Sequence, residues 1–319
     1  MKVFTPLLCN LLAYAEYQNI CANTLKEIVS RSGIRMDKEE GMIDAEAYLI
    51  VLEKIIEVSK SEHSGLYIGA YLNLKALGLV LEISMNTSSI EHGVIILQRF
   101  LKEKFPLVSA TIIKDSERYI IQLESIVKNN QLRKHLLDMV LCIVYRELNL
   151  MLPSKYPLQI RLPYNHINPY KDLLKVKVDQ YPAYQILMPL DVIQAEINMK
   201  NIREVELLLP KYISMLDQSD KSTHTFSSQT RSMILNMCTP EIPSFQEVQR
   251  QFFYSKRTIQ RKLKEEKMSF RAIVNSIKQE LAMYLSYEKH LKTKDIAFIL
   301  GYSDSSAYLH AAKKWRKQS

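Results

Sequence analysis

The feature that most limits how this chain can fold is the absence of proline from its last 76 residues, after Pro243. The same stretch holds a single glycine, Gly301. Proline breaks helices and strands, and glycine is the usual residue of turns with a positive φ. A stretch of this length and composition therefore predicts a domain built entirely of helices with short connections.

Residues 244–266, SFQEVQRQFFYSKRTIQRKLKEE, carry the signals of two short helices joined by a tight turn. Ser244 and Glu247 have the spacing of a capping box that opens the first helix, and Ser255 can cap the second. At about 100° per residue, Ile259 and Leu263 share one side of the second helix. Its other side carries Arg257, Gln260, Arg261 and Lys264. This distribution of side chains is typical of a helix-turn-helix whose second helix enters the DNA major groove. For this segment alone, an ordinary amphipathic helix with a solvated basic face is the alternative.

The same pattern recurs 48 residues later in the chain. A second pair of helices, KDIAFIL and DSSAYLHAAKKWRK, is joined at Gly301. Ser269 opens a long amphipathic helix between the two motifs, and a helix of about 20 residues spans about 30 Å. That length approaches the 34–36 Å between major-groove entries one helical turn apart, so both units could bind one face of a duplex. The recurring residues are Val248, Phe252, Tyr254 and Ser255, matched by Ile296, Leu300, Tyr302 and Ser303.

The positive charge of the chain lies in this C-terminal stretch. Residues 226–319 hold 17 Lys and Arg against 8 Asp and Glu, which leaves 26 of the 43 basic and 26 of the 34 acidic residues in the first 225. A neutral body with one basic module is typical of a protein that contacts a polyanion through one domain. An anionic membrane surface is the competing partner, and it is disfavoured because the basic helices lack an interfacial Trp, Phe and Leu face.

The first 215 residues predict helices that cover a small sheet, an α+β domain. Capping boxes are predicted at Thr24 with Glu27 and at Ser88 with Glu91. Gly65 and Gly69 lie in an apolar segment where close helix approach or a bend is the expected reason for glycine. Residues 107–115 and 118–125 predict a β-hairpin, residues 156–164 and 183–190 two more strands, and residues 129–152 a long buried helix. Residues 202–218 predict a closing helix, and the polar residues 216–225 predict a linker to the helical domain at 226–319.

Other classes of protein find little support. The chain has no G-x-S-x-G, P-loop or G-x-G-x-x-G motif, and its histidines lack metal-ligand spacing, so no enzyme, cofactor or metal site is predicted. The longest run without a charged residue, 3–15, has 13 residues, fewer than the roughly 20 that cross a bilayer. The four cysteines, Cys9, Cys21, Cys142 and Cys238, form no C-x-x-C pair, which fits reduced thiols in a cytoplasmic protein.

The motifs Y-S-K-R-T-I-Q-R-K-L-K-E-E-x-x-S-F and D-I-A-F-I-L-G-Y-S-D-S-S-A-Y resemble the C-terminal DNA-binding domain of the AraC/XylS family of transcription regulators, over residues 226–319. More loosely, the segment from Gly33 to Gly78 is similar to the N-terminal domain of the family branch named for arabinose binding. The resemblance implies RNA polymerase, a small-molecule effector and a second copy of the chain as partners besides double-stranded DNA. It departs from the family pattern at His310, where Arg is usual, and at Ala312, where a core Phe is usual. The DNA-contacting residues that follow from the motifs are Lys256, Arg257, Gln260, Arg261 and Lys264 in the first unit and Ser305, Ser306, Leu309, His310 and Lys313 in the second.

These observations predict a sequence-specific transcription regulator, an activator that responds to a small molecule through its N-terminal domain. Two alternatives stay open: an architectural DNA-binding protein of low specificity, and an enzyme domain fused to a DNA-binding module. A ratio of specific to non-specific affinity near one would select the architectural protein. The second unit is expected to be loosely packed, because Ala312 stands where a core Phe is usual. It is expected to select bases weakly, because it lacks the arginines of the first unit.

Overall fold

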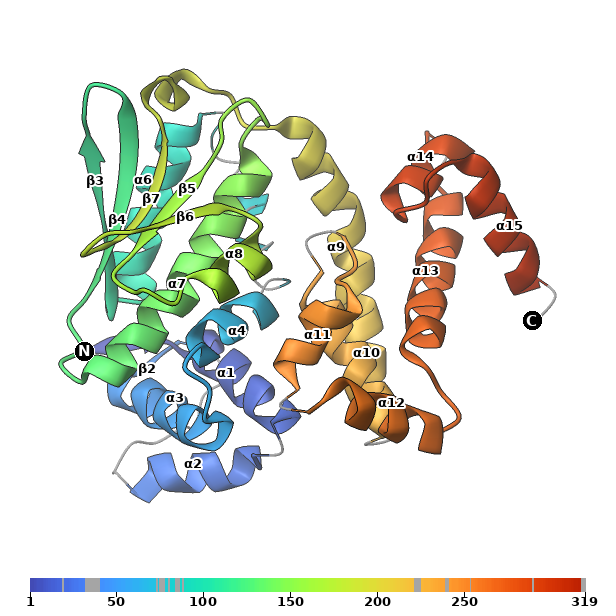
Figure 1. The fold of residues 1–319 in the computed structure, drawn as a ribbon, viewed down its shortest axis with the longest axis horizontal. Coiled ribbons are helices and arrows are strands. Elements are labelled where there is room, and N and C mark those ends of the chain that lie inside the picture. The colour runs from blue at the N-terminus through green and yellow to red at the C-terminus, as the bar shows by residue number, and fades with distance from the viewer. Residues whose placement is uncertain are drawn as a thin grey trace. The chain divides into compact units, whose positions relative to one another are not determined.

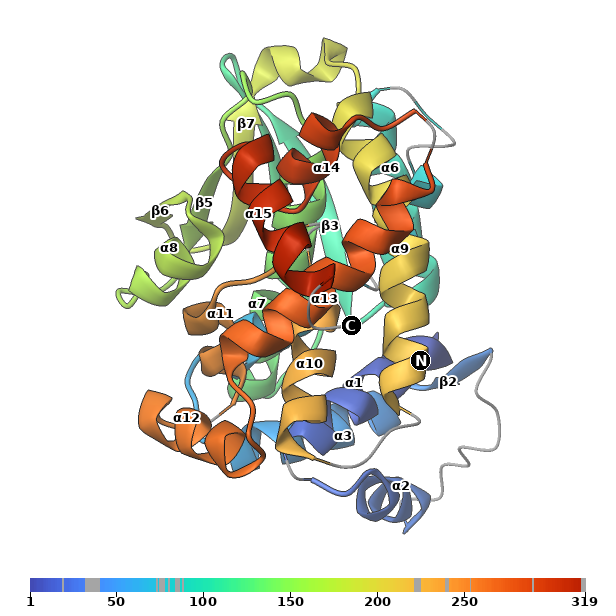
Figure 2. The same ribbon diagram turned by 90° about the vertical axis from the view of Figure 1, so that its right-hand side faces the viewer.

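The structure is a computed structural model, which describes residues 1–18, 20–31, 41–72, 74, 78–79, 81–83, 87, 89–220, 225–238, 241–252, 254–288 and 290–316. The chain divides into two compact units, each described below by itself. The N-terminal unit comprises Met1–Ile202 with Gln251–Phe253, and the C-terminal unit comprises Arg203–Arg250 with Tyr254–Ser319. The N-terminal unit combines helices with sheet and the C-terminal unit is helical, which confirms the predicted fold class (Figures 1 and 2).

The N-terminal unit begins with helices and a two-stranded sheet. Strand β1 (Lys2–Phe4) pairs antiparallel with β2 (Met42–Asp44), and Asp44 caps α3 by accepting from the Glu46 N–H at 3.0 Å. Such a cap satisfies one of the four N–H groups that a helix leaves unpaired at its start. The helices of this part are α1 (Thr5–Tyr17), α2 (Ala22–Arg31), α3 (Ala45–Ser59) and α4 (Ser64–Tyr71).

Two predicted capping boxes are placed differently in the structure. Helix α2 starts at Ala22, with the Leu25 N–H donating to the Cys21 carbonyl at 3.2 Å, so Thr24 lies inside the first turn and its predicted cap is wrong. Helix α6 (Ile90–Lys104) is capped by Ser89, whose hydroxyl accepts from the His92 N–H at 3.3 Å. The predicted cap Ser88 lies outside the described residues.

A five-stranded sheet follows, in the order β3-β4-β7-β5-β6. All neighbours are antiparallel except the parallel pair β5 and β6. The predicted hairpin and both predicted strands are confirmed as β3 with β4, β5 and β7. Strand β6 was not predicted, because its four residues bury only Val178 and offer no apolar alternation. The bounds are β3 (Val108–Lys114), β4 (Arg118–Ser125), β5 (Gln159–Leu162), β6 (Lys177–Gln180) and β7 (Tyr184–Pro189).

The two faces of this sheet differ in polarity. Ile121, Ile160 and Ile186 are fully buried on the face toward α7 (Asn130–Met151), where the Tyr184 hydroxyl donates to the Lys134 carbonyl at 3.5 Å. The cross-strand register places a polar row on the other face, namely Thr111, Gln122, Gln185, Arg161 and Asp179. Its side chains bond along the row: the Gln185 amide donates to Gln122 at 2.8 Å, and Arg161 donates to Gln185 at 3.4 Å.

Helices α4 and α7 approach each other closely, and two glycines make this possible. A Cβ on Gly65 would lie 2.0 Å from the His135 carbonyl oxygen, and one on Gly69 would lie 2.7 Å from the Met139 carbonyl oxygen. No side chain fits at these positions, which confirms close approach as the reason for both glycines. The described part of this apolar segment is therefore core.

The remaining elements of the N-terminal unit are α8 (Asn168–Leu174) and the 3-10 turn η1 (Leu190–Gln194). Helix α9 (Met199–Asp220) then runs past the end of this unit. It continues through residues 216–220, which were predicted to be linker, and residues 221–224 lie outside the described part. The division of the chain at 215 and 226 stays a prediction.

The C-terminal unit contains six further helices in the predicted order. Ser244 and Glu247 form both hydrogen bonds of the predicted capping box, at 3.3 and 2.7 Å, and Ser269 caps α13 by accepting from the Ala272 N–H at 3.1 Å. Gly301 joins α14 to α15 with φ of 68°, a conformation that costs glycine little. The helices are α10 (Phe226–Asn236), α11 (Phe245–Gln251), α12 (Lys256–Glu265), α13 (Phe270–Ser286), α14 (Thr293–Ile299) and α15 (Ser305–Arg316).

Candidate nucleic-acid interface

Helix α12 has a buried apolar side and an exposed polar side, as the sequence predicts. Ser255 caps the helix by accepting from the Thr258 N–H at 3.1 Å, which sets its first turn. Ile259 and Leu263 are 2% and 1% exposed, so they anchor the helix in the core of the unit. The predicted DNA-contacting residues of this helix are all exposed: Lys256, Arg257, Gln260, Arg261 and Lys264.

The end of α12 is fixed to the start of α10 by a carboxylate that the sequence analysis did not single out. Glu266 accepts from the N–H groups of Phe226 at 2.7 Å and Ser227 at 2.8 Å. Partial burial opposes ionisation of this carboxyl, but the hydrogen bonds from Ser227 and Phe226 and the nearby Lys262 hold its pKa below the usual value. A carboxylate at a helix N-terminus is favourable because it bonds the free N–H groups and faces the positive end of the helix dipole. Glu266 therefore holds α12 in a fixed position within the C-terminal unit.

Lys262 is the one lysine of α12 that turns toward aromatic rings on both sides. Its ammonium lies 5.3 Å from the centre of the Phe226 ring and 4.9 Å from that of Tyr254. Both distances are within the range of cation–π attraction. Lys262 thus contributes to packing, whereas Lys256 and Lys264 remain on the exposed side.

Arg261 makes one contact that DNA binding would have to break. Its guanidinium lies 2.7 Å from the Glu265 carboxylate, and the two side chains are 64% and 59% exposed. An exposed ion pair one turn apart on a helix is worth only about 0.3–0.5 kcal/mol. Arg261 can therefore exchange this partner for a base edge at little cost.

Helix α15 is built around two aromatic side chains. Tyr308 and Trp315 are each 9% exposed, with ring centres 6.5 Å apart, and Tyr302 from the preceding turn lies 5.9 Å from Tyr308. These rings provide the large side chains that Ala312 lacks. Of the predicted contact residues, Ser306, Leu309, His310 and Lys313 are exposed and Ser305 is half-buried.

Helix α13 connects the two helix-turn-helix units. Arg231 of α10 lies 2.9 Å from Glu280 of α13, and the rings of Phe245 and Phe270 stand 5.2 Å apart between α11 and α13. Near the middle of α13, the Lys278 ammonium lies 4.5 Å from the centre of the Tyr302 ring, which belongs to the second unit. With 17 residues, α13 is about 25 Å long at 1.5 Å per residue. It is somewhat shorter than the spacer that the sequence predicts.

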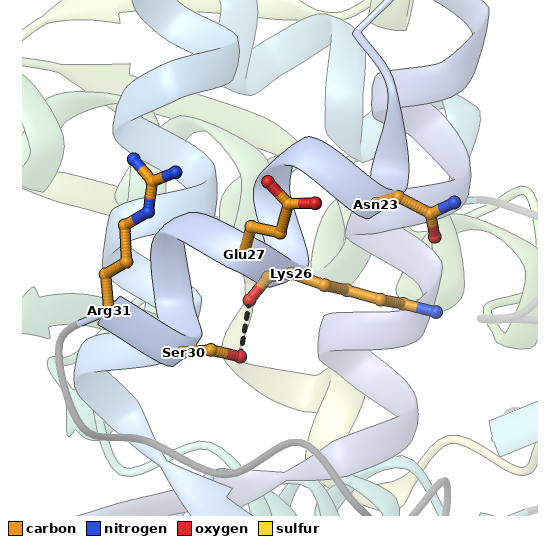
Figure 3. A pocket seen from close by; sticks show the side chains of 5 residues that line it. All are labelled: Asn23, Lys26, Glu27, Ser30 and Arg31. Atoms are coloured by element: carbon orange, nitrogen blue, oxygen red, sulfur yellow. Dashed lines mark hydrogen bonds between the residues drawn. The ribbon is translucent and has the colours of Figure 1, made fainter.

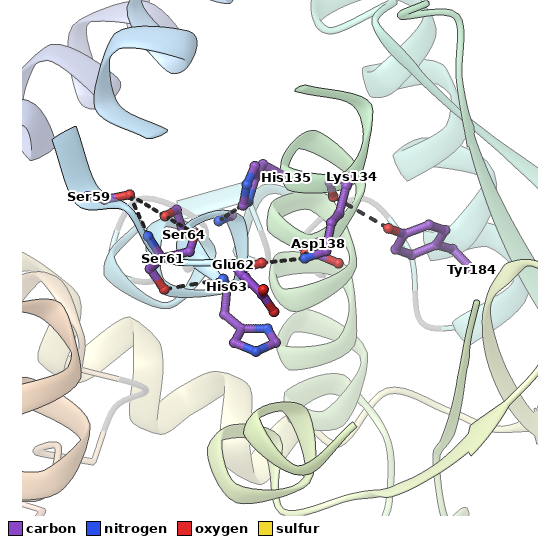
Figure 4. A network of polar contacts seen from close by, with 10 residues as sticks. Ser59, Ser61, Glu62, His63, Ser64, Lys134, His135, Asp138 and Tyr184 are labelled. Carbon is purple, nitrogen blue, oxygen red and sulfur yellow. Dashed lines mark hydrogen bonds and ion pairs between the residues drawn. The ribbon is translucent and has the colours of Figure 1, made fainter. Parts of the chain in front are cut away.

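In the N-terminal unit, the most prominent cluster of polar side chains gathers at the start of α7 (Figure 4). The Lys134 ammonium lies 3.1 Å from the fully buried Asp138 carboxylate, donates to the Glu62 carbonyl, and lies 4.8 Å from the centre of the Tyr164 ring. Burial raises the pKa of Asp138 to about 6, against the opposing effect of Lys134. Burial likewise lowers the pKa of His135 to about 4, and its Nδ1 accepts from the Gly65 N–H at 3.2 Å. The cluster ties α7 to α4 and to the segment after β5.

A depression of about 620 Å³ lies on α2 (Figure 3). Its lining residues all belong to that one helix, and the Ser30 hydroxyl among them donates to the Lys26 carbonyl at 2.8 Å. A surface formed by one polar helix face lacks the apolar walls typical of small-molecule sites. This depression supplies no evidence for an effector site.

The described residues contain neither a membrane-spanning helix nor a cluster of metal-ligating side chains. No helix among them is long and apolar enough to span a membrane. No group of three or more His, Cys, Asp and Glu side chains is placed to hold a metal ion there.

Comparison with known proteins gives the following matches. Residues 26–178 match the family model of the arabinose-binding domain of AraC transcription regulators, N-terminal. The HTH-type transcriptional regulator VqsM of Pseudomonas aeruginosa is 29% identical over 91 residues, which are 28% of this chain and 28% of that relative. The match thus spans less than a third of the relative's length. The crystal structure of the transcriptional regulator CdpR, also from Pseudomonas aeruginosa, is similar with a TM-score of 0.40 and 19% identity, over 91% of this chain and 93% of that one.

Proposed function

We propose that the chain is a transcription regulator of the AraC type, because residues 26–178 match the arabinose-binding domain of such regulators, and that it binds specific sequences in double-stranded DNA through α12 and α15. The observation that carries this proposal is the arrangement of α12. Arg257, Gln260 and Arg261 are exposed on a helix that is held from its other side by Ile259 and Leu263. A recognition helix needs this combination of a rigid anchor and free polar groups.

The chemistry of these side chains assigns their roles within the proposal. Arginine forms bidentate hydrogen bonds with guanine O6 and N7, and glutamine does so with adenine N6 and N7. Arg257, Gln260 and Arg261 therefore specify bases. Lys256, Lys264 and Lys313 contact backbone phosphates, which position the protein without selecting a sequence.

The second recognition helix has a different set of groups. Ser305 and Ser306 can bond several bases, Leu309 can contact a thymine methyl group, and His310 can donate or accept one hydrogen bond. In this proposal α15 makes the weaker contribution to sequence choice. The first unit selects the operator, and the second extends the contact.

The N-terminal unit receives the signal in this proposal. The family model that matches residues 26–178 supports this role, as does the equal number of acidic and basic residues in the first 225. The signal is a small molecule, and the unit also mediates pairing with a second copy of the chain. The protein activates transcription by contacting RNA polymerase when bound to a promoter.

In vitro selection of duplexes by the full-length protein tests the DNA-binding part. We expect an enriched motif, and an affinity for it that falls linearly with salt on a logarithmic scale. The matched control is the same duplex with its motif shuffled, which should bind at least 10³-fold more weakly. Equal affinity for both duplexes would favour the architectural alternative, and no binding to either would contradict DNA binding altogether.

A further inference from the structure

A pocket of about 290 Å³ is lined by residues of α13 and α15 in the C-terminal unit. The ribbon shows α15 crossing α13 (Figure 2). This cavity is called the α13–α15 pocket below. Its volume is near the lower limit of about 300 Å³ for small-molecule sites, so it suits a single compact group. The lining residues are Arg271 and Asn275 from α13, Tyr302 from the turn, and Ala307, His310, Ala311, Lys314 and Trp315 from α15.

The lining of this pocket carries positive charge and no carboxylate. Arg271, His310 and Lys314 are exposed at its edge, Asn275 adds an amide, and Trp315 is 9% exposed. Cationic and amide donors around an aromatic side chain suit an oxyanion, because every strong polar group there except the amide oxygen can donate a hydrogen bond.

The pocket cations are not neutralised within the described chain. Three other basic groups of the C-terminal unit do have partners: Arg231 pairs with Glu280, Arg261 with Glu265, and Lys262 lies against two rings. Neither Arg271 nor Lys314 forms an ion pair with any other described residue. Their charges are available to an external anion.

The position of Arg271 in its helix strengthens this conclusion. It lies in the first turn of α13, which contains no acidic residue and starts at the cap Ser269. A cation there is unfavourable because it faces the positive end of the helix dipole, whereas an anion is favoured. Helix stability therefore does not explain Arg271, but a bound anion next to it would gain from both the guanidinium and the dipole.

We propose that the α13–α15 pocket binds a phosphate group of the DNA backbone, held between Arg271 and Lys314. The proposal rests on the proposed DNA binding. A backbone phosphate is favoured over a free anion because His310, on the edge of the pocket, belongs to the side of α15 predicted to contact DNA. Arginine suits this role, since its planar guanidinium bonds two phosphate oxygens at once. One phosphate bound by both helices would fix the second recognition helix against α13 and set its register on the duplex.

The test compares two double variants of the full-length chain with equal changes in charge. Arg271→Gln/Lys314→Gln removes the pocket cations, and Lys102→Gln/Lys128→Gln removes two exposed lysines of the N-terminal unit. Binding to a selected duplex is measured by fluorescence anisotropy over a range of salt concentrations. Losing one phosphate contact should make the slope of log affinity against log salt shallower by about 0.9 in the pocket variant only. The penalties for single mismatched bases should stay unchanged, because phosphates carry no sequence information.

Trp315 provides an independent readout, because it is the only tryptophan of the chain. Duplex DNA should change its fluorescence in the wild type and not in the pocket variant, with circular dichroism confirming that both are folded. If the pocket variant keeps the wild-type salt slope, the proposal is overturned while DNA binding stands. If inorganic phosphate alone changes the Trp315 emission and that slope is kept, the pocket binds a free anion instead. If the wild type binds no duplex, the proposed function itself fails.

Discussion

The two units of the chain differ in where their ionisable side chains lie. The buried His, Asp and Glu residues of the described chain all lie on α7 in the N-terminal unit, namely His135, Asp138 and Glu147. The C-terminal unit keeps most of its described cations exposed, and some of its carboxylates accept hydrogen bonds from helix N-termini, as Glu266 does for α10. The N-terminal unit should therefore respond to pH, and the C-terminal unit to salt and to polyanions.

The pKa values of the buried carboxyls on α7 and of Glu266 shift in opposite directions. Burial raises the pKa of Asp138 to about 6 and that of Glu147 to about 8, because neither carboxylate is well solvated when ionised. Hydrogen bonds from N–H groups hold the pKa of Glu266 below its usual value against the effect of burial. For the raised carboxyls, stability is greatest below the unfolded pKa and is lost as pH rises through the folded pKa. For Glu266, stability is present at neutral pH and is lost as pH falls.

The largest expected effect comes from removing the charge of Glu147. Its pKa rises from 4.5 to about 8, which corresponds to at most about 5 kcal/mol of destabilisation above pH 8, at 1.36 kcal/mol per unit. Glu147→Gln should therefore stabilise the N-terminal unit at pH 9 by several kcal/mol and have little effect at pH 4. Hydrogen exchange of α7 peptides in the full-length protein at both pH values measures this.

Trp315 fluorescence during urea unfolding serves as the control, since it reports on the C-terminal unit and should not change with Glu147→Gln. Equal protection of α7 in both proteins at pH 9 would show that the Glu147 carboxylate has a partner in solution. The contrast between the two units would then rest on Asp138 alone.

The next largest effect is expected at the contact of α4 with α7. Gly65→Ala places a Cβ 2.0 Å from the His135 carbonyl oxygen, so the helices must separate, and overpacking of this kind typically costs about 1–3 kcal/mol or more. Thermal unfolding followed by circular dichroism measures the loss. Gly78→Ala is the matched control, because a Cβ there meets no atom within 4 Å. If both variants melted like the wild type, the close approach of these helices would be contradicted.

The sequence predicts a local structure well when the residues that form it lie close together in the chain. The Ser244 and Glu247 capping box is confirmed to the individual hydrogen bond, because both partners lie within one turn. The Thr24 cap failed for the same local reason, since a suitable spacing inside a helix looks like one at its start. Strand β6 went unpredicted because its existence depends on pairing with β5, not on its own four residues.

Contacts between residues far apart in the chain could not be predicted from the sequence. The helix at 129–152 was predicted to be buried, but which of its polar residues enter the core depends on elements far along the chain. The α13–α15 pocket joins residues about 40 positions apart, and neither Arg271 nor Lys314 was predicted as a contact residue from the motifs. The close helix contact at α4 could be predicted because it requires glycine, and the glycines are visible in the sequence of that segment.

For the C-terminal unit, the Arg261→Ala variant tests the contact of the first recognition helix with DNA. Losing a bidentate base contact costs about 1–3 kcal/mol of discrimination, so affinity for a selected duplex should fall 10-fold or more and base preference should relax at one position. The Arg261 ion pair with Glu265 offsets little of this, because it is exposed. Anisotropy with the selected duplex and its single-base variants measures both quantities. Lys211→Ala, a charge removed from α9, is the control and should leave base preference unchanged.

The smallest effect is expected from His310→Ala, and its comparison with Arg261→Ala ranks the two recognition helices. His310 is exposed, lies beside Leu309, which is 54% exposed, and can make one hydrogen bond to a base or phosphate. A single hydrogen bond of this kind contributes about 0.5–1.5 kcal/mol, so the loss should stay near the lower end of that range, and base preference should hardly change. Tyr308 and Trp315 keep α15 packed in this variant, so the measured change reports on contact with DNA and not on folding. If His310→Ala reduced affinity as much as Arg261→Ala, with relaxed preference in the other half of the site, both helices would select bases and α15 would be more than a positioning element.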